Sequence, residues 1–280
     1  EKRILMLLIF LCISISSIIG AYIRIGISYY KIWHTETNYC IMYTQLVGCF
    51  IMGYTVTFKK QYYDQTSSRL SKAIYLSITS GLCGSITSFS GWQLQCNRNF
   101  FLQLDISWGN TIGSYNGGRL LEWIVCMWSG VVLPLSALHF GFYISTLIHQ
   151  PNQLTPTYLP PPSSSNSSDD LKNYPYSKFI LVTFFVITIT LVVLLPVLFF
   201  PNWMYLSFTA VLGVIGAYIR YLLSDFNSLN PSFPIGTFIV NVLGTWIAAG
   251  ILGISKFGID YYDIKIQSIL YGLLTGFCGC

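Results

Sequence analysis

The amino-acid sequence predicts an all-α integral membrane protein with two antiparallel four-helix repeats joined by a single linker helix. Three observations predict this fold: only 9% of the 280 residues are charged, the uncharged residues form long apolar runs, and one five-residue motif occurs twice. Soluble domains usually carry about 25% charged residues. We therefore expect most of the surface to face lipid, and nine spans in the complete fold, with the last one and a half outside this chain.

Eight uncharged runs, which are the candidate spans, follow one another along the chain. They cover residues 4–23, 39–58, 73–95, 123–148, 179–200, 203–219, 227–255 and 266–280. A hydrocarbon core about 30 Å thick requires roughly 20 helical residues. Seven of the runs have or approach this length, and the eighth is expected to begin a further span. Lys2 and Arg3 precede the first run as they would in a signal peptide, but the run is longer than a typical signal core.

The internal repeat is the most informative feature. The motif Gly20–Arg24 recurs unchanged as Gly216–Arg220, an offset of 196 residues. The same register, or one residue less, pairs Gly48 with Gly244, Gln45 with Asn241, and Gly81–Gly84 with Gly276–Gly279. Matches that keep register over such a distance indicate two copies of one unit.

Each copy is expected to contain the same succession of helices. A first helix ends in the repeated motif, a second carries glycines that permit close helix contact, and a third is rich in glycine. In the first copy the run 123–148 is the fourth helix. One extra run, 179–200, lies between the copies and would make the second copy start from the opposite side of the membrane. Such inverted repeats typically hold the working site between them at the midplane.

The chain therefore divides into four parts. Residues 1–150 are the first four-helix channel repeat, 151–177 a flexible linker, 178–201 the linker transmembrane helix, and 202–280 the truncated second repeat. The linker is expected to stay unfolded because its prolines and serines bury too little apolar surface. A glycosylation sequon at Asn166 falls in this linker, which we place in the cytosol, so we expect no glycan there.

Basic residues in the second loop predict the orientation. Lys59, Lys60, Arg69 and Lys72 crowd that loop, and cytoplasmic loops carry an excess of such residues. We therefore expect a multi-pass protein of the plasma membrane with a cytosolic N-terminus. The net charge of +5 is explained by these loops, so we expect the lipid bilayer and no nucleic acid as a partner.

The eight cysteines form no CxxC pair and no spacing suited to zinc. Most lie within apolar runs, where a thiol behaves as a small hydrophobic group. Cys40 and Cys96 are predicted to lie on the same outer side and could pair, although nothing in the sequence requires the bond.

The absence of acidic residues from the middle of the apolar runs restricts the function. Proton-coupled pumps and cation transporters generally hold a carboxylate at depth, whereas Glu122 and Asp225 fall only at expected helix ends. Neutral N–H and O–H donors suit a small anion. A secondary transporter of a small anion on the same plan remains an alternative. A membrane-embedded enzyme would need a deep His, Cys or acidic cluster, so we expect no enzyme; no nucleotide-binding GxxxxGK[ST] motif is present either.

The segment Thr87–Trp92 and Asn241 are the candidate site residues. Clustered Ser and Thr after glycines favour a broken helix. Phe89 and Trp92 are three residues apart and share a helical face, and their positive ring edges can contact an anion; a packed aromatic stripe is the alternative. For Asn241 the alternative is an interhelical hydrogen bond.

Three further polar residues are assigned structural roles. Arg24 and Arg220, near helix ends, are expected to extend to the membrane surface as anchors. His139 is expected to be buried and hydrogen-bonded and not to be a ligand.

Taken together, these motifs resemble the fluoride channel family in its fused two-repeat eukaryotic form. Its first-helix motif GAxxR appears as Gly20–Arg24 and again as Gly216–Arg220. Its second-helix motif GTxxVNxxG appears as Gly236–Gly244, and its broken third helix GxxTTFSTF appears as Gly84–Trp92. The resemblance implies a passive fluoride-selective ion channel that exports fluoride and functions as a single two-repeat chain.

The resemblance also implies roles for individual residues. Asn241 would donate its amide to fluoride, and the pore lining would include Phe89, Trp92 in place of the usual Phe, Ser88 and Ser90. Gln45 replaces the asparagine of the first repeat, so that pore is expected to be degraded. Backbone carbonyls would hold a structural Na⁺, and they belong to Gly84, Thr87 and Gly279.

Overall fold

The computed structural model describes residues 2–29, 39–58, 69–101, 116–149, 203–230, 232–256 and 264–280. Within these residues every regular element is helical. The segments predicted as a flexible linker, 151–177, and as a linker helix, 178–201, lie outside the described residues, as do most of the basic second loop and the sequon.

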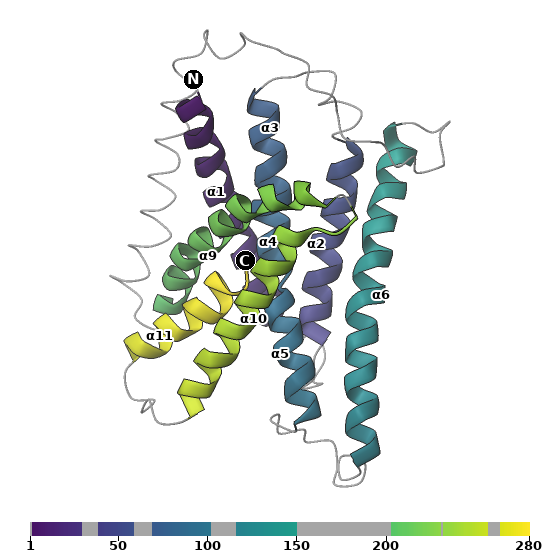
Figure 1. Ribbon diagram of the computed structural model, residues 1–280, viewed down its shortest axis with the longest axis vertical. Helices are drawn as coiled ribbons and strands as arrows, with labels where there is room; N and C mark the ends of the chain where they lie inside the picture. Colours follow the sequence, from purple (N-terminus) through teal and green to yellow (C-terminus); the bar gives the residue numbers. More distant parts are fainter. Residues whose placement is uncertain are drawn as a thin grey trace.

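The first half of the chain forms two continuous helices, one interrupted helix and a long peripheral helix (Figure 1). In chain order these are α1 (Lys2–Tyr29), α2 (Tyr39–Phe58), α3 (Arg69–Leu76), the π-helix η2 (Ser77–Cys83), α4 (Gly84–Ile86), α5 (Phe89–Phe100) and α6 (Asn116–His149). The second half repeats this order as far as its third helix. Its elements are α9 (Met204–Leu223), the 3₁₀-helix η5 (Ser224–Leu229), α10 (Ile235–Lys256), α11 (Ile264–Gly272) and the π-helix η6 (Leu273–Phe277).

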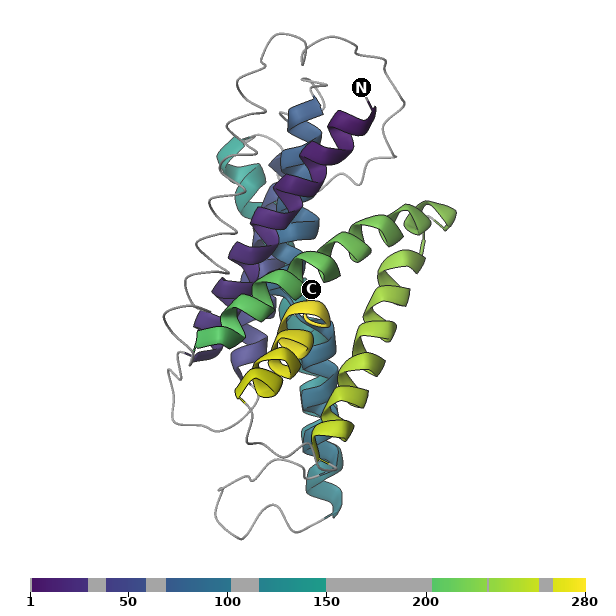
Figure 2. The same ribbon diagram turned by 90° about the vertical axis from the view of Figure 1, so that its left-hand side faces the viewer.

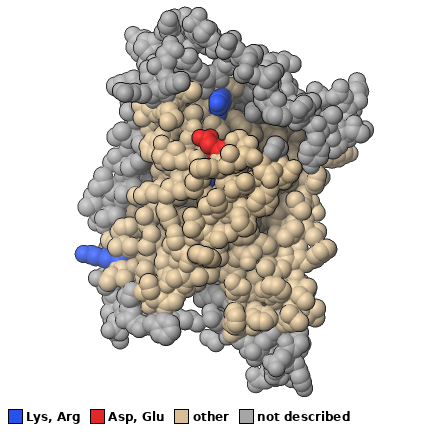
Figure 3. Space-filling model, viewed as in Figure 1, with Lys and Arg blue, Asp and Glu red and all other residues tan. Residues whose placement is uncertain are grey.

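Five of the described helices are long and apolar enough to cross a membrane. They contain the segments Leu5–Ser28, Ile41–Phe58, Trp123–His149, Met204–Leu229 and Ile235–Ile254. Figure 3 shows that almost all described side chains on one face of the molecule are uncharged. Large apolar side chains are exposed there and elsewhere, including Trp128 at 71% and Trp246 at 72%. Such extensive apolar exposure is expected for a protein whose outer surface contacts lipid, so the prediction of an α-helical membrane protein is confirmed.

The chain passes through the two halves in opposite directions. In Figure 1 α1 descends from the N-terminus, whereas α9 rises, and Figure 2 shows the same two helices crossing. Likewise α2 rises and α10 descends. The two copies of the repeated motif, in α1 and α9, therefore enter from opposite ends of the molecule.

The break in the third helix is confirmed at the predicted place. Helix α4 ends at Ile86, Thr87 is extended with φ −76° and ψ 144°, and α5 begins at Phe89. The π-helices η2 and η6 were not predicted. They occupy matching positions in the two halves, because the offset of 195 residues carries 78–82 of η2 onto η6.

Glycines bring α2 and α6 into backbone contact. A Cβ atom on Gly53 would meet the backbone of Leu138, and one on Gly141 would lie 2.9 Å from the amide nitrogen of Tyr54. Neither position has room for a side chain, as expected for closely packed membrane helices.

The prediction for His139 was wrong, and the open question of a partner for Cys96 is answered on the same helix. His139 is exposed on α6 and meets the ring of Phe142 edge-on at 5.8 Å, because α6 lies at the periphery of the described bundle. Cys96 pairs with Cys126 of α6 and not with Cys40; the two Cα atoms are 5.8 Å apart. The partner of Cys96 depends on which face α6 turns toward α5, and sequence spacing does not reveal that rotation.

Candidate functional site

The broken third helix satisfies most of its own polar groups. The Ser88 hydroxyl accepts the backbone N–H of Gly91 at 3.2 Å and so caps the start of α5. The Thr87 hydroxyl donates to the carbonyl of Cys83 at 2.9 Å. These local bonds let the chain interrupt a helix in an apolar environment without leaving these groups unpaired.

Gln45 of α2 contacts this break from the side. Its Nε2 donates to the Ser88 carbonyl at 3.1 Å, and the side chain is only 8% exposed. One donor of the Gln45 amide is therefore engaged with the backbone of the same half. This geometry gives Gln45 a structural role at the break, since buried polar groups are normally hydrogen-bonded.

Ser90 connects the break to the second half of the chain. Its hydroxyl donates to the Cys278 carbonyl at 2.6 Å in a buried contact. A second buried connection runs from Ser85 to Ser17 at 2.9 Å and from Ser17 to the Gly213 carbonyl at 3.1 Å. Both connections join the first half of the chain to the second through buried hydroxyl groups.

The two arginines of the repeated motif make reciprocal contacts across the halves. Arg24 of α1 donates to the carbonyls of Gly279 and Thr275 in the second half. Arg220 of α9 donates in the opposite sense, to the Gly84 carbonyl at 3.4 Å in the first half. The prediction that they extend to the membrane surface was wrong: each guanidinium turns inward to carbonyls near the end of an interrupted helix, where helical hydrogen bonding is incomplete.

Arg220 also fixes the orientation of Asn241. Its Nη2 donates to Asn241 Oδ1 at 3.4 Å. Because a guanidinium has donors only, the amide oxygen must face it, and the Asn241 N–H₂ group faces elsewhere. No residue in the described ranges accepts a hydrogen bond from that group. The Nε of Arg220 is buried and likewise has no acceptor among the described residues.

The aromatic pair of α5 shares one helical face, as predicted. The rings of Phe89 and Trp92 meet edge-to-face with centroids 5.5 Å apart. Trp92 is 8% exposed and its indole N–H donates to the Cys126 carbonyl of α6 at 3.1 Å. This placement favours the packed-stripe interpretation for Trp92, whereas Phe89 remains partly exposed at the start of α5.

A cavity of about 270 Å³ lies between the halves, next to the break. The first half contributes Arg24, Ser88 and Ser90 to its lining, and the second half contributes Tyr271 and Thr275. The Arg24 guanidinium and the Ser90 and Thr275 hydroxyls each donate to a backbone carbonyl at this wall, and the bonds of Arg24 and Ser90 join the two halves around the cavity.

The predicted site residues are therefore brought together in two places and not in one. Ser88 and Ser90 line the cavity with Arg24, while Asn241 lies with Arg220. Sequence reasoning missed the contribution of both arginines, Tyr271 and Thr275; the repetition of GAYIR was the available signal for the arginines.

Two of the three predicted sodium ligands, the carbonyls of Gly84 and Gly279, already have hydrogen-bond donors in this arrangement, which are Arg220 and Arg24. A sodium ion there would have to displace both guanidinium groups or lie against their positive charge, which is costly at short range in an apolar interior.

Comparison with known proteins adds a family and several relatives. The family model described as CrcB-like protein, Camphor Resistance (CrcB) matches residues 11–133 and 207–280, more than half of the chain. The chain is 26% identical to Fluoride export protein 1 of Candida albicans over 219 residues, which cover 74% of this chain and 51% of that protein. It is 22% identical to Fluoride export protein 2 of Saccharomyces cerevisiae over 279 residues, covering 85% and 72%.

A shorter match reaches single-repeat-sized relatives. Over 67 residues the chain is 39% identical to Fluoride-specific ion channel FluC of Pyrococcus furiosus, covering 24% of this chain and 51% of that protein. No solved structure matches the chain. This chain spans about half the length of the Candida relative.

Proposed function

Because this chain belongs to the CrcB-like protein family, we propose that it is a passive, fluoride-selective ion channel that lets fluoride leave the cytosol down its electrochemical gradient. Relatives in fungi are named fluoride export proteins, and archaeal relatives are named fluoride-specific ion channels. The family is one of channels and transporters and not of enzymes.

The Arg220–Asn241 pair is the observation that carries this proposal. A buried guanidinium Nε–H without an acceptor loses hydrogen bonding to water and costs roughly 1–3 kcal/mol. Fluoride is a compact anion that accepts hydrogen bonds from such donors. With the amide oxygen turned toward Arg220, the Asn241 N–H₂ group is free to donate to the same anion. A cation would meet only donors and a positive charge.

We further propose that the chain is an inverted two-repeat channel that functions as a single chain. The opposite directions of α1 and α9, the matched π-helices and the reciprocal arginine contacts support this architecture. In it the segment 178–201 is the linker helix that reverses the second repeat, and the complete fold has nine spans.

In this channel the Asn241 side conducts fluoride. Phe89 of the interrupted helix contributes to this anion pathway, whereas Ser88 and Ser90 line the separate cavity beside Arg24. Trp92 contributes mainly by packing. The pathway on the Gln45 side is degraded, since one amide donor of Gln45 is held by the Ser88 carbonyl.

We place the protein in the plasma membrane with its N-terminus in the cytosol. The basic residues between α2 and α3 support this orientation through the positive-inside rule. Export through a passive pore then follows from the membrane potential, which is negative inside and drives an anion outward.

The test is fluoride efflux from liposomes that contain the full chain. The parent protein should release fluoride and retain chloride, and the Asn241→Asp variant should lose at least tenfold in fluoride efflux. The carboxylate removes the N–H₂ donor and repels the anion, yet it can still accept from Arg220, so the fold is preserved.

Asn230→Asp is the matched control. Asn230 is exposed, and its Oδ1 accepts the backbone N–H of Ser232 at 2.9 Å, a bond that a carboxylate retains. This variant should conduct like the parent. Undiminished efflux through Asn241→Asp would remove Asn241 from the pathway, and efflux that is strictly coupled to a proton gradient would favour a secondary transporter.

A further inference from the structure

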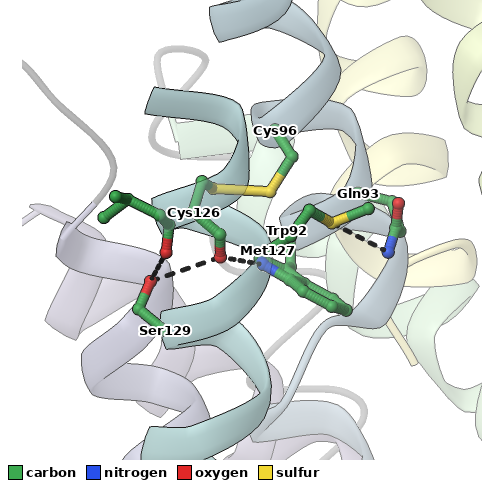
Figure 4. Close-up of a disulfide and its surroundings, with 7 residues drawn as sticks. Trp92, Gln93, Cys96, Cys126, Met127 and Ser129 are labelled. Carbon is green, nitrogen blue, oxygen red and sulfur yellow. Dashed lines mark hydrogen bonds between the residues drawn. A yellow bond between two sulfur atoms is a disulfide. The ribbon is translucent and has the colours of Figure 1, made fainter. Parts of the chain in front are cut away.

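A disulfide between Cys96 and Cys126 joins α5 to α6. Neither cysteine belongs to the motifs that the sequence repeats. Figure 4 shows the Cys96–Cys126 bond beside Trp92, Gln93, Met127 and Ser129. Next to it the Trp92 indole N–H donates to the Cys126 carbonyl, and Gln93 Nε2 lies 3.9 Å from Met127 Sδ. Trp92 and Cys96 are one helical turn apart on α5, so the bond and the ring form one patch.

α6 is shaped to receive this patch. Gly130, one turn after Cys126, has no side chain, and a Cβ atom there would overlap the indole of Trp92. Cys96 is fully buried and Cys126 is 5% exposed. The disulfide is therefore part of a packed interface and not a chance approach of two surface thiols.

The opposite side of α5 faces the second half of the chain. Ser90 donates to the Cys278 carbonyl, and Leu94 packs against the cluster that contains Ala248 and Cys278. At its start α5 is joined to α4 only through the extended Thr87 and the cap residue Ser88. A 12-residue helix connected through a non-helical segment needs a second attachment if its pore residues are to stay in place.

We propose that the Cys96–Cys126 disulfide is a covalent tether that holds the pore-lining half-helix α5 against α6, and that it forms on the non-cytosolic side of the membrane. The proposal that it positions a pore rests on the fluoride-channel function above; the existence of the bond does not. Disulfides form and persist in oxidising compartments. In Figure 1 α5 leads away from the end of the molecule at which α3 begins, and the basic residues that precede α3 assign that end to the cytosol. The two arguments give the same orientation independently.

Forming the bond removes two electrons and two protons from the two thiols. A disulfide-bearing oxidoreductase of the secretory pathway takes them up and is reduced to its dithiol form. Because both sulfurs are buried in the folded protein, the tether is made during biogenesis and is then shielded from polar reductants.

Thiol counting tests the bond. The full chain is purified from eukaryotic membranes without reductant, denatured, and treated with a maleimide–polyethylene glycol reagent before and after reduction. Two additional thiols should react only after reduction, and mass spectrometry should recover a Cys96–Cys126 peptide pair. Both thiols reacting before reduction would overturn the tether.

A paired set of variants tests the positioning role. Cys96→Ser/Cys126→Ser should lower fluoride efflux at least threefold and lower the melting temperature by about 5 °C, roughly the shift for loss of a constraint in a protein of this size. Cys12→Ser/Cys49→Ser, which changes two free cysteines, should conduct like the parent. Unchanged efflux in the first variant would overturn the positioning role. If the parent protein moves no fluoride, the proposed function fails while thiol counting still decides the bond.

Discussion

At the scale of single residues, Arg24 and Arg220 connect the two halves, because each donates to a backbone carbonyl of the other half. The sequence singles out the amide of Asn241 and the hydroxyls near Thr87 as candidates, because polar groups within apolar runs are rare. The roles of Arg24 and Arg220 were mispredicted, since the positions near expected helix ends resembled surface anchors. Their acceptors lie up to 255 residues away along the chain, and no local pattern reveals such partners.

The double role of Arg220 leads to a testable expectation. Arg220→Gln should lower fluoride efflux by about tenfold or more, because hydrogen bonds to charged groups contribute roughly 1.5–3 kcal/mol each and the variant also loses the positive charge beside Asn241. Initial efflux rates from liposomes measure the effect. Lys72→Gln removes the same charge from an exposed position on α3 and should be neutral; equal losses in both variants would indicate a general charge effect.

At the scale of elements, the sequence predicted where helices are interrupted but not how they turn toward one another. Glycines followed by clustered Ser and Thr located the break at Thr87, because the physical cause of the break is local. The π-helices before it and the face that α6 presents to α5 depend on packing. For that reason the sequence left the partner of Cys96 open.

Helix packing between α2 and α6 gives the prediction at this scale. Gly141→Ala should destabilise the protein by about 1–3 kcal/mol, the usual penalty for an added group in a filled interface, because its Cβ would overlap the backbone of α2. Thermal unfolding in detergent measures the change. Gly250→Ala is the matched control: nothing lies within 4 Å of a Cβ at Gly250 of α10, and alanine favours the helix by up to about 1 kcal/mol.

At the scale of the whole molecule, counting spans predicted opposite threading, and α1 and α9 do run in opposite directions. Lipid requires every span to cross completely, so the number of spans between two motifs determines their relative orientation. The linker helix on which the count depends lies outside the described residues, and its place stays a prediction.

Opposite threading predicts which exposed positions share a side of the membrane. A cysteine at Ser228, in the 3₁₀-helix after α9, should react with a membrane-impermeant maleimide only after permeabilisation of cells. A cysteine at Phe101, which is 64% exposed after α5, should react in intact cells. The parent chain provides the background for both. Labelling of both positions from the same side would contradict the proposed inverted architecture.

The reciprocal arginine contacts also have a consequence for biosynthesis. Arg24 emerges from the ribosome early, whereas its acceptors at Thr275 and Gly279 follow about 250 residues later. At roughly 5–20 residues per second, translation leaves this guanidinium without its final acceptors for on the order of 10–50 s. During that interval the nascent first half must keep the group in contact with water or with the insertion machinery. The early half is thus an obligate intermediate, and completion of the later half is what allows Arg24 to enter the bundle.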